Sequence, residues 1–450
     1  MKKIVLAGLG GCFFAFSTAG YGDFMDLDQA VAYALEHNPQ LAAAAQQTRA
    51  SNAAEQAVAG QRLPSVDLSY STQRSNNPLD AFASKLNTGS VNPATDFSPE
   101  ALNDPAPSTL HATQLSVSLP VYTGGRIDAS MRAAEANTHS AEFSQERLGR
   151  FTVFQVRKNY REAQASTERV VIATAAAEAA SNHVATTSRL VRQGRIITSD
   201  KLTAEVNLAA VNAALEQART QSRLAFNQLT TLLGRAPTDP ALSLTPWPQT
   251  RPAIALPPLT QLEQQALTQR KDLLALSSLQ QARQAEIDQA RANYKPQFLV
   301  VGNNQWFDSP DTRDDNSWSV MGVVKMNLFS GGSHRNQIAA KTYQSLEVEQ
   351  RLRAARLQVI NEVRNAHALL QEAQARLQLA ADNVAKAERT VELVRNRYGQ
   401  GRTILIDLLQ AERALVDARN EALNAALAHD TGIDALELAV GTTLHTANGT

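Results

Sequence analysis

Two short stretches of this 450-residue chain combine a Gln-Gly-Arg triplet with polar side chains at fixed distances from it. Glycine inside a helix costs about 1 kcal/mol relative to alanine, so each triplet indicates a break between two helices. Gln193-Gly194-Arg195 is followed by Ser199 and Asp200, and Gln400-Gly401-Arg402 is preceded by Tyr398 and followed by Asp407. A carboxylate just after such a break suits the positive N-terminal end of the next helix dipole.

The chain offers no residue pattern for catalysis. It has no HExxH, P-loop or GxSxG motif and no Cys/His cluster. Its eight histidines are scattered, and we expect His183 and His367 on helix surfaces. The sequence therefore predicts no catalytic residue, no cofactor and no metal site. Lys+Arg and Asp+Glu both number 43, so charge gives no case for nucleic acid as a partner.

The N-terminus has the layout of a secretory signal peptide. Two lysines precede an apolar run over residues 4–16, and small residues follow, which places cleavage near Ala19 to Gly22. The only cysteine, Cys12, lies in "LGGC", which has the shape of a bacterial lipobox. The apolar run continues past Cys12, which favours ordinary cleavage and leaves lipidation of Cys12 as the alternative.

The mature sequence is a tandem repeat. At an offset of 207 residues, "VYTGG" (121–125) matches "LFSGG" (328–332), the two Gln-Gly-Arg triplets match, and Asp200 matches Asp407. An earlier segment matches at an offset of 232, so the length difference falls within residues 74–110, a Pro- and Asn-rich segment expected to be a loop. Each copy reads as helix, strand, loop, strand, very long helix, turn and helix.

The strands carry one apolar face each. Leu115, Val117, Leu119 and Val121 alternate with serines and Pro120, and the second copy repeats the pattern over residues 298–300 and 318–328. Paired glycines, Gly124-Gly125 and Gly331-Gly332, then permit a sharp change to helix. Hairpins on a soluble core could show this alternation, but an exported chain with strands of about ten residues also fits membrane β-structure. One chain supplies four strands and a small barrel needs about eight, so several chains would have to share a barrel.

The helices show a sustained heptad repeat. Residues 359–398 place apolar or aromatic side chains at alternating steps of four and three, with no proline or glycine from residue 333 to 398. Such a repeat predicts a coiled coil, and the helix would be on the order of 100 Å long.

These patterns define the expected organisation of the chain. Residues 1–22 are the signal peptide, 23–234 the first repeat with a tip near 193–195, and 235–258 a Pro-rich connector. Residues 259–441 are the second repeat, with a strand-joining loop near 304–316 and a tip near 399–402, and 442–450 are a C-terminal tail.

Taken in order, these features resemble the TolC-like outer-membrane efflux protein family. The resemblance rests on "AVAYALEHNPQL" (30–41), the two Gly-Gly junctions, the two Gln-Gly-Arg turns and "RTILIDLLQAE" (402–412), and it covers almost the whole mature chain. It implies a mainly α protein with a small β part: a homotrimer with four strands per chain in a shared 12-stranded outer-membrane barrel, continued by an α-barrel of antiparallel coiled-coil helices. The duct would lie in outer-membrane lipid, with a large periplasmic part. Its partners would be a periplasmic adaptor (membrane fusion) protein and an inner-membrane transporter of RND or ABC type.

The resemblance also implies residue roles. The tip residues Gln193, Gly194, Arg195, Gln400 and Gly401 would contact the adaptor. Ser199, Asp200, Tyr398, Arg402 and Asp407 would form the constriction, which opens by an iris-like movement. Two positions depart from the family pattern: the second acidic position is Gln410, and the gating arginine falls on Thr403, one residue after Arg402. The competing hypothesis is a periplasmic structural or adaptor coiled coil that never enters the membrane.

Overall fold

The computed structural model describes residues 23–236, 239, 242–248, 251, 256–309 and 312–443. The chain divides into two units made of interleaved segments: unit 1 is Met1–Ala43, Leu148–Gln269 and Val359–Thr450, and unit 2 is Ala44–Arg147 and Arg270–Gln358. The signal segment with Cys12, most of the C-terminal tail and part of the connector lie outside the described residues. None of the described helices is both long and apolar enough to cross a membrane.

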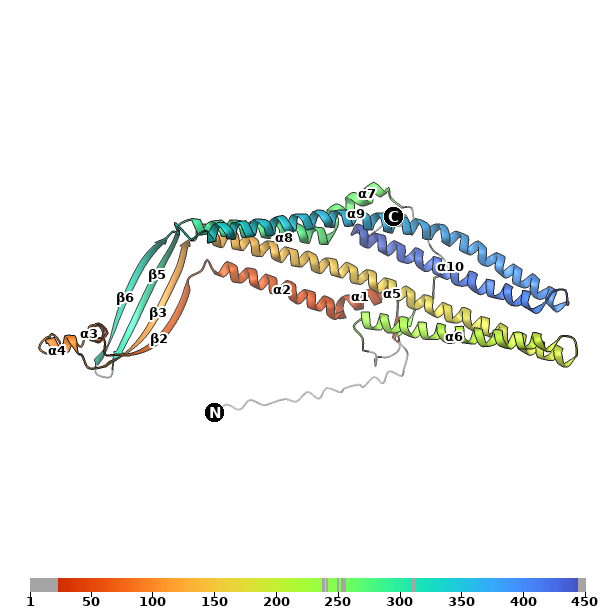
Figure 1. The fold of residues 1–450 in the computed structure, drawn as a ribbon, viewed down its shortest axis with the longest axis horizontal. Coiled ribbons are helices and arrows are strands. Elements are labelled where there is room, and N and C mark those ends of the chain that lie inside the picture. Colours follow the sequence, from red (N-terminus) through yellow and green to blue (C-terminus); the bar gives the residue numbers. More distant parts are fainter. Residues whose placement is uncertain are drawn as a thin grey trace, which may run out of the picture. The chain divides into compact units, whose positions relative to one another are not determined.

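Unit 2 contains one antiparallel sheet of four strands in the order β2-β3-β5-β6 (Figure 1). The strands are β2 (Ser65–Ser75), β3 (Ser108–Tyr122), β5 (Gln297–Ser309) and β6 (Thr312–Lys325). Residues Met326 and Leu328, expected in the last strand, follow its end. The pairing of β5 with β6 stops at Gln297 and Lys325, because Pro296 precedes β5 and has no N–H to continue the ladder.

The register separates an apolar face of the sheet from a polar one. Paired residues share a face, so Val66 lies with Val117 and Gly302, and Leu68 lies with Leu115 and Asn304. Much of the apolar face is open: Leu68 is 72% exposed and Val320 is 70% exposed. On the polar face, Gln114 and Ser116 both donate to Asn303 Oδ1 at 3.1 and 2.8 Å. The predicted alternation is therefore clear in β2 and β3, whereas β5 and β6 also place Leu299, Val301, Met321 and Val323 on the polar face.

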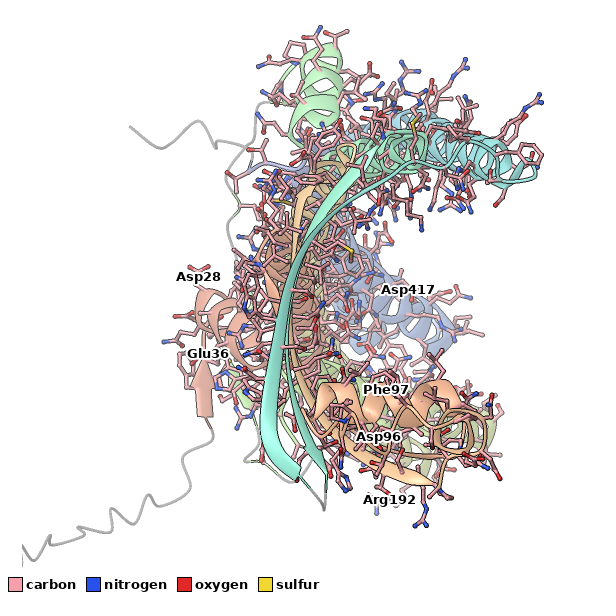
Figure 2. The ribbon with its side chains drawn as sticks, turned by 90° about the vertical axis from the view of Figure 1, so that its left-hand side faces the viewer. Asp28, Glu36, Asp96, Phe97, Arg192 and Asp417 are labelled. Carbon is pink, nitrogen blue, oxygen red and sulfur yellow. The ribbon has the colours of Figure 1, made fainter. Side chains whose placement is uncertain are left out.

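The segments expected to be loops differ from the expectation in both copies. Residues 74–110 contain α3 (Pro78–Asn87) and α4 (Pro99–Asn103), and both flanking strands extend into this range. Lys85 and Asp96 join the two halves of the segment through an ion pair of 2.6 Å, and Phe82 packs edge-on against Phe97. Asp96 and Phe97 are labelled in Figure 2. In the second copy, β5 and β6 continue through most of 304–316. Local turn-forming residues suggested loops, but cross-strand pairing and capping order most of these residues.

Besides α3 and α4, unit 2 contains most of α2 (Pro39–Gly60), α8 (Lys271–Arg291), a 3-10 turn (Ala292–Tyr294), and the first parts of α5 (Arg126–Arg192) and α9 (Ser333–Gly399). Ion pairs connect them, including Arg132 with Asp288 at 3.1 Å and Lys341 with Glu286 at 2.8 Å. Each of the two long helices has 67 residues.

Unit 1 contains two helical hairpins. The rest of α5 turns into α6 (Thr198–Leu232), and the rest of α9 turns into α10 (Leu405–Val440). The heptad prediction for α9 is confirmed, because every predicted seam position is buried or half-buried, including Val363 and Leu370 at 0% exposure. Neighbouring non-seam positions are exposed, as at Leu369 and Leu379. The hairpin geometry thus follows from the spacing of apolar residues.

Short elements complete unit 1. The strands β1 (Asp23–Met25) and β4 (Leu242–Leu244) pair in parallel, and α1 (Leu27–His37) starts with a capping box between Asp26 and Gln29. Exposed carboxylates such as Asp28 and Glu36 lie on α1 (Figure 2). The helix α7 (Leu259–Gln269) buries Leu262.

Candidate functional site

The two hairpin tips have the same backbone geometry. Gly194 and Gly401 both have φ of +69°, and the N–H of the arginine after each glycine donates to a carbonyl five residues back, at 3.0 Å in the first tip and 2.9 Å in the second. This is the Schellman ending, in which a left-handed residue closes the last helical turn. A Cβ at either glycine would meet no neighbour within 4 Å, so the backbone angle and not a lack of space requires glycine there.

Gly399 plays a different part from Gly401. It is the last residue of α9, its φ is not positive, and a Cβ there would also meet nothing. The second tip therefore needs only one of its two glycines for the turn.

The acidic residues after each turn lie in the first turn of a helix. Ile197 and Ile404 occupy the N-cap positions of α6 and α10 and provide no side-chain cap, while Asp200 and Asp407 lie in the first turns. Their negative charges favour these helix ends. Thr403 Oγ1 also donates to Asp407 Oδ2 at 2.5 Å, so the threonine at the expected arginine position holds the Asp407 carboxylate.

The structure brings together some of the predicted site residues. Tyr398 at the end of α9 lies close enough to Asp200 of α6 for the charge to act on it: burial, and then the charge of Asp200, raise the pKa of the Tyr398 hydroxyl. Ser199 and Arg402 are exposed, and among the described residues Arg402 forms no ion pair. Tyr398 and Asp200 therefore lie near one another on the two hairpins, and Arg402 is exposed at the second tip.

A direct link between the hairpins was missed by sequence reasoning. His183 on α5 contacts Glu412 on α10 at 2.8 Å, and Arg395 on α9 reaches the same carboxylate at 3.2 Å. The His183 side chain is only 13% exposed, which corrects the expectation that it lies on a helix surface. Burial by itself raises the pKa of Glu412, but the hydrogen bond from His183 and the charges of His183 and Arg395 lower it, and the net shift is downward.

Glu412 and Arg395 line an open cavity of about 790 Å³ within unit 1. Alanines of α5 and α6 form one side, and charged residues of α9 and α10 form the other. The charged lining includes Glu388, Glu392, Arg395, Glu412, Arg413 and Asp417. Among the described residues no group of three His, Cys, Asp or Glu side chains is placed to hold a metal ion.

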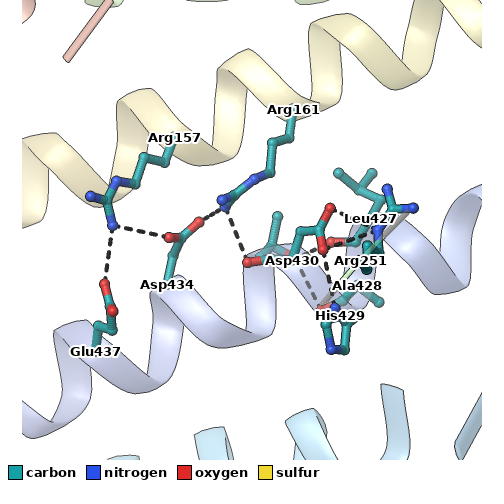
Figure 3. A network of polar contacts seen from close by, with 10 residues as sticks. Arg157, Arg161, Arg251, Leu427, Ala428, His429, Asp430, Asp434 and Glu437 are labelled. Carbon is teal, nitrogen blue, oxygen red and sulfur yellow. Dashed lines mark hydrogen bonds and ion pairs between the residues drawn. The ribbon is translucent and has the colours of Figure 1, made fainter. Parts of the chain in front are cut away.

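A larger polar network lies farther from the tips (Figure 3). Arg157 of α5 contacts Asp434 and Glu437 of α10 at 3.3 and 3.0 Å, and Arg161 also pairs with Asp434. Burial lowers the pKa of Arg161, while the charge of Asp430 raises it. Arg251 of the connector bonds Asp430 at 3.0 Å, so the connector is tied to the same helix. No sequence signal pointed to this network, because its members lie up to 280 residues apart.

The strand-to-helix junctions use left-handed glycines in both copies. Gly124 and Gly125 have φ of +66° and +85°, and Gly331 and Gly332 have +60° and +81°. Only Gly124 is also crowded, since a Cβ there would lie 2.7 Å from Lys295 Cβ and 2.9 Å from the Ala292 carbonyl oxygen.

The chain thus combines two long antiparallel helical hairpins with a four-stranded sheet that has an open apolar face. The chain matches the outer membrane efflux protein family over residues 30–235 and 262–442, and it belongs to that family. It is therefore an outer-membrane efflux protein.

Solved structures share the fold. The outer-membrane channel OprN is 22% identical with a TM-score of 0.79, covering 92% of this chain and 89% of that chain. The Campylobacter jejuni CmeC channel is 16% identical with a TM-score of 0.81 (94% and 87%). The Neisseria gonorrhoeae MtrE channel is 18% identical with a TM-score of 0.74 (94% and 91%). A comparison with curated proteins gave no match.

Proposed function

We propose that three copies of this chain form a passive export duct through the outer membrane. The family works with periplasmic adaptors and inner-membrane transporters in tripartite systems, and the duct would dock with both through its helical tips. The transporter, of RND or ABC type, would supply the energy.

The observation that carries this proposal is the open sheet. β2 and β6 are edge strands with no further partner among the described residues, and both are exposed along almost their whole described length. An unpaired strand edge in lipid costs several kcal/mol per polar group. Pairing β6 of one copy with β2 of the next removes every edge, and three copies supply twelve strands.

The length of the apolar face along the strands matches the apolar band of a membrane barrel. Phe298 and Trp306 share this face and are eight residues apart, which at about 3.3 Å per residue spans roughly 26 Å. Tyr70 and Trp318 lie at or next to the level of Trp306. Membrane barrels carry an apolar band of about 25 Å between aromatic girdles. This face would therefore contact lipid, and the polar face with Gln114 and Asn303 would line the lumen.

The tips provide the docking and gating groups of the proposal. The tip residues Gln193, Gly194, Arg195, Gln400 and Gly401 are all exposed and would meet the adaptor. Tyr398, Asp200, Arg402 and Asp407 would meet around the constriction in the closed state. An iris-like opening would then separate these contacts without unfolding either hairpin.

Fractionation and cross-linking test the duct. We expect the protein in the outer-membrane fraction, migrating as a trimer before heating and as a monomer after it, and conducting ions in planar bilayers. A monomer released with the soluble periplasmic proteins would instead support a periplasmic coiled coil and overturn the proposal.

Site-specific photocross-linking tests the docking separately. A photoreactive residue at Gln400 should capture the adaptor in cells, whereas one at Arg219, exposed on α6 away from the tip, should not. Equal capture at both positions would remove the tips from the docking role.

A further inference from the structure

The polar face of the sheet contains an apolar patch that the duct itself does not require. The register places Val301 opposite Met321 and Leu299 opposite Val323 on β5 and β6, all on the face of Gln114 and Asn303. Met321 is 52% exposed, and the other three are half-buried. We call these four residues the lumen patch.

Polar residues bound the lumen patch on both sides along the strands. The rung toward the strand-joining end pairs Asn303 with Ser319, and the rung at the other end pairs Gln297 with Lys325. Lys325 is exposed and forms no ion pair within the described part of the chain. A cationic head thus lies two residues from Val323 on the same strand and the same face.

We propose that the lumen patch with Lys325 binds small amphiphilic organic anions during their passage through the duct. The apolar body would lie on the four side chains, and the anionic group would pair with Lys325. Four side chains are far fewer than the 20–30 residues per partner, roughly, that a stable protein interface uses, so the occupant is a small molecule and not a second protein. This inference rests on the proposed function, in which this face lines a water-filled lumen.

Single-cysteine labelling tests the inference. If Cys12 is cleaved off or lipidated, the mature protein has no free thiol. Ser319→Cys then places one next to the patch without altering it, and Val320→Cys places one on the opposite face. In proteoliposomes, an anionic, membrane-impermeant methanethiosulfonate should label Ser319→Cys but not Val320→Cys. Octanesulfonate should slow this labelling at a lower concentration than butanesulfonate does. The protecting concentration should fall about two- to fourfold for each added methylene, because each methylene buries more apolar surface on the patch.

Second-site variants identify the patch. Val323→Ser and Lys325→Gln, each combined with Ser319→Cys, should each raise the protecting concentration of octanesulfonate several-fold. Ser317→Ala, on the same face but beyond the polar rung, is the matched control and should not change it.

The outcomes separate the two proposals. Labelling of Ser319→Cys that neither sulfonate slows would overturn the lumen patch and leave the duct proposal intact. Protection that is independent of chain length and unchanged in both second-site variants would do the same. Labelling of Val320→Cys in place of Ser319→Cys would mean that the apolar face of the sheet meets water. That result would overturn both the lumen patch and the proposed duct with its apolar face toward lipid.

Discussion

Single residues at the tips combine local and long-range roles. Asp407 accepts a hydrogen bond from Thr403 and stabilises the start of α10, yet its side chain remains exposed. In a trimer, three such carboxylates would lie around the constriction and attract cations. Glu412, by contrast, is held within the chain by His183 and Arg395. Of these two acids, Glu412 is bound within the chain, and Asp407 would face the constriction in the proposed trimer.

The Asp407→Ala variant should weaken the block of single-channel current by divalent cations, because it removes a ring of negative charge from the mouth. Planar-bilayer recordings with Mg²⁺ on the periplasmic side measure this. Asp417→Ala, farther along α10, is the control. Undiminished block in Asp407→Ala would exclude Asp407 from the constriction.

The His183–Glu412–Arg395 contact should make the stability of the hairpins depend on pH in the acidic range. The folded-state pKa of Glu412 lies below its ordinary 4.5, so its contribution is present above pH 4.5 and is lost as the pH falls through the lower folded value. Glu412→Gln should cost on the order of 1–3 kcal/mol at neutral pH and flatten the pH dependence below 4.5. Hydrogen exchange of α5 and α10 reports the loss. Glu392→Gln, exposed on α9, serves as the control, and a similar effect there would argue against a specific link.

At the scale of elements, the junctions between strand and helix depend on glycine to different degrees. Both copies turn with positive φ angles, but Gly124 also lies against the end of the 3-10 turn, while a Cβ at Gly331 would meet nothing. The first junction is therefore fixed by both angle and close packing, and the second by angle alone.

This difference predicts unequal effects of the same substitution. Gly331→Ala should cost roughly 1 kcal/mol for the left-handed angle, and Gly124→Ala should cost clearly more, because Lys295 and the Ala292 carbonyl must also shift. The midpoint of heat dissociation of the purified protein measures both. Equal midpoints in the two variants would show that crowding of a Cβ at Gly124 does not destabilise the protein further.

At the scale of the whole molecule, one chain is an incomplete structure. It exposes an apolar sheet face, two strand edges and apolar residues on α6 and α9, including Val206 at 72% and Leu379 at 69% exposure. Exposed apolar surface of this kind marks sites for lipid or for other subunits. In the proposed trimer, lipid and neighbouring copies would cover this surface, so folding and assembly should be coupled.

The two faces of β6 should respond oppositely to the same charge. Val320→Lys puts a charge at the centre of the lipid-facing band and should cost about 2–4 kcal/mol, reducing the yield of trimer in the outer membrane. Ser319→Lys, next in sequence but on the polar face, should be tolerated. Quantitative immunoblots of membrane fractions compare them, and tolerance of both changes would contradict the assigned orientation.

Local sequence periodicity determined much of this protein. The heptads of α9, the alternation of the strands and the glycine turns at Gly194 and Gly401 depend on neighbours a few residues away, so their spacing alone specifies them. The strand-joining segments were expected to be loops because turn-forming residues dominate them. Lys85 with Asp96 and the pairing of β5 with β6 order them instead.

Only the tertiary structure decided which distant groups meet. His183 and Glu412 are 229 residues apart, and no local pattern relates them. The Arg157–Asp434 contact and the lumen patch likewise depend on which helix or strand lies beside which, and at what register. Local backbone preferences act over a few residues, whereas these contacts form only after the hairpins and the sheet have packed; the sequence therefore determined the elements, and packing determined the site.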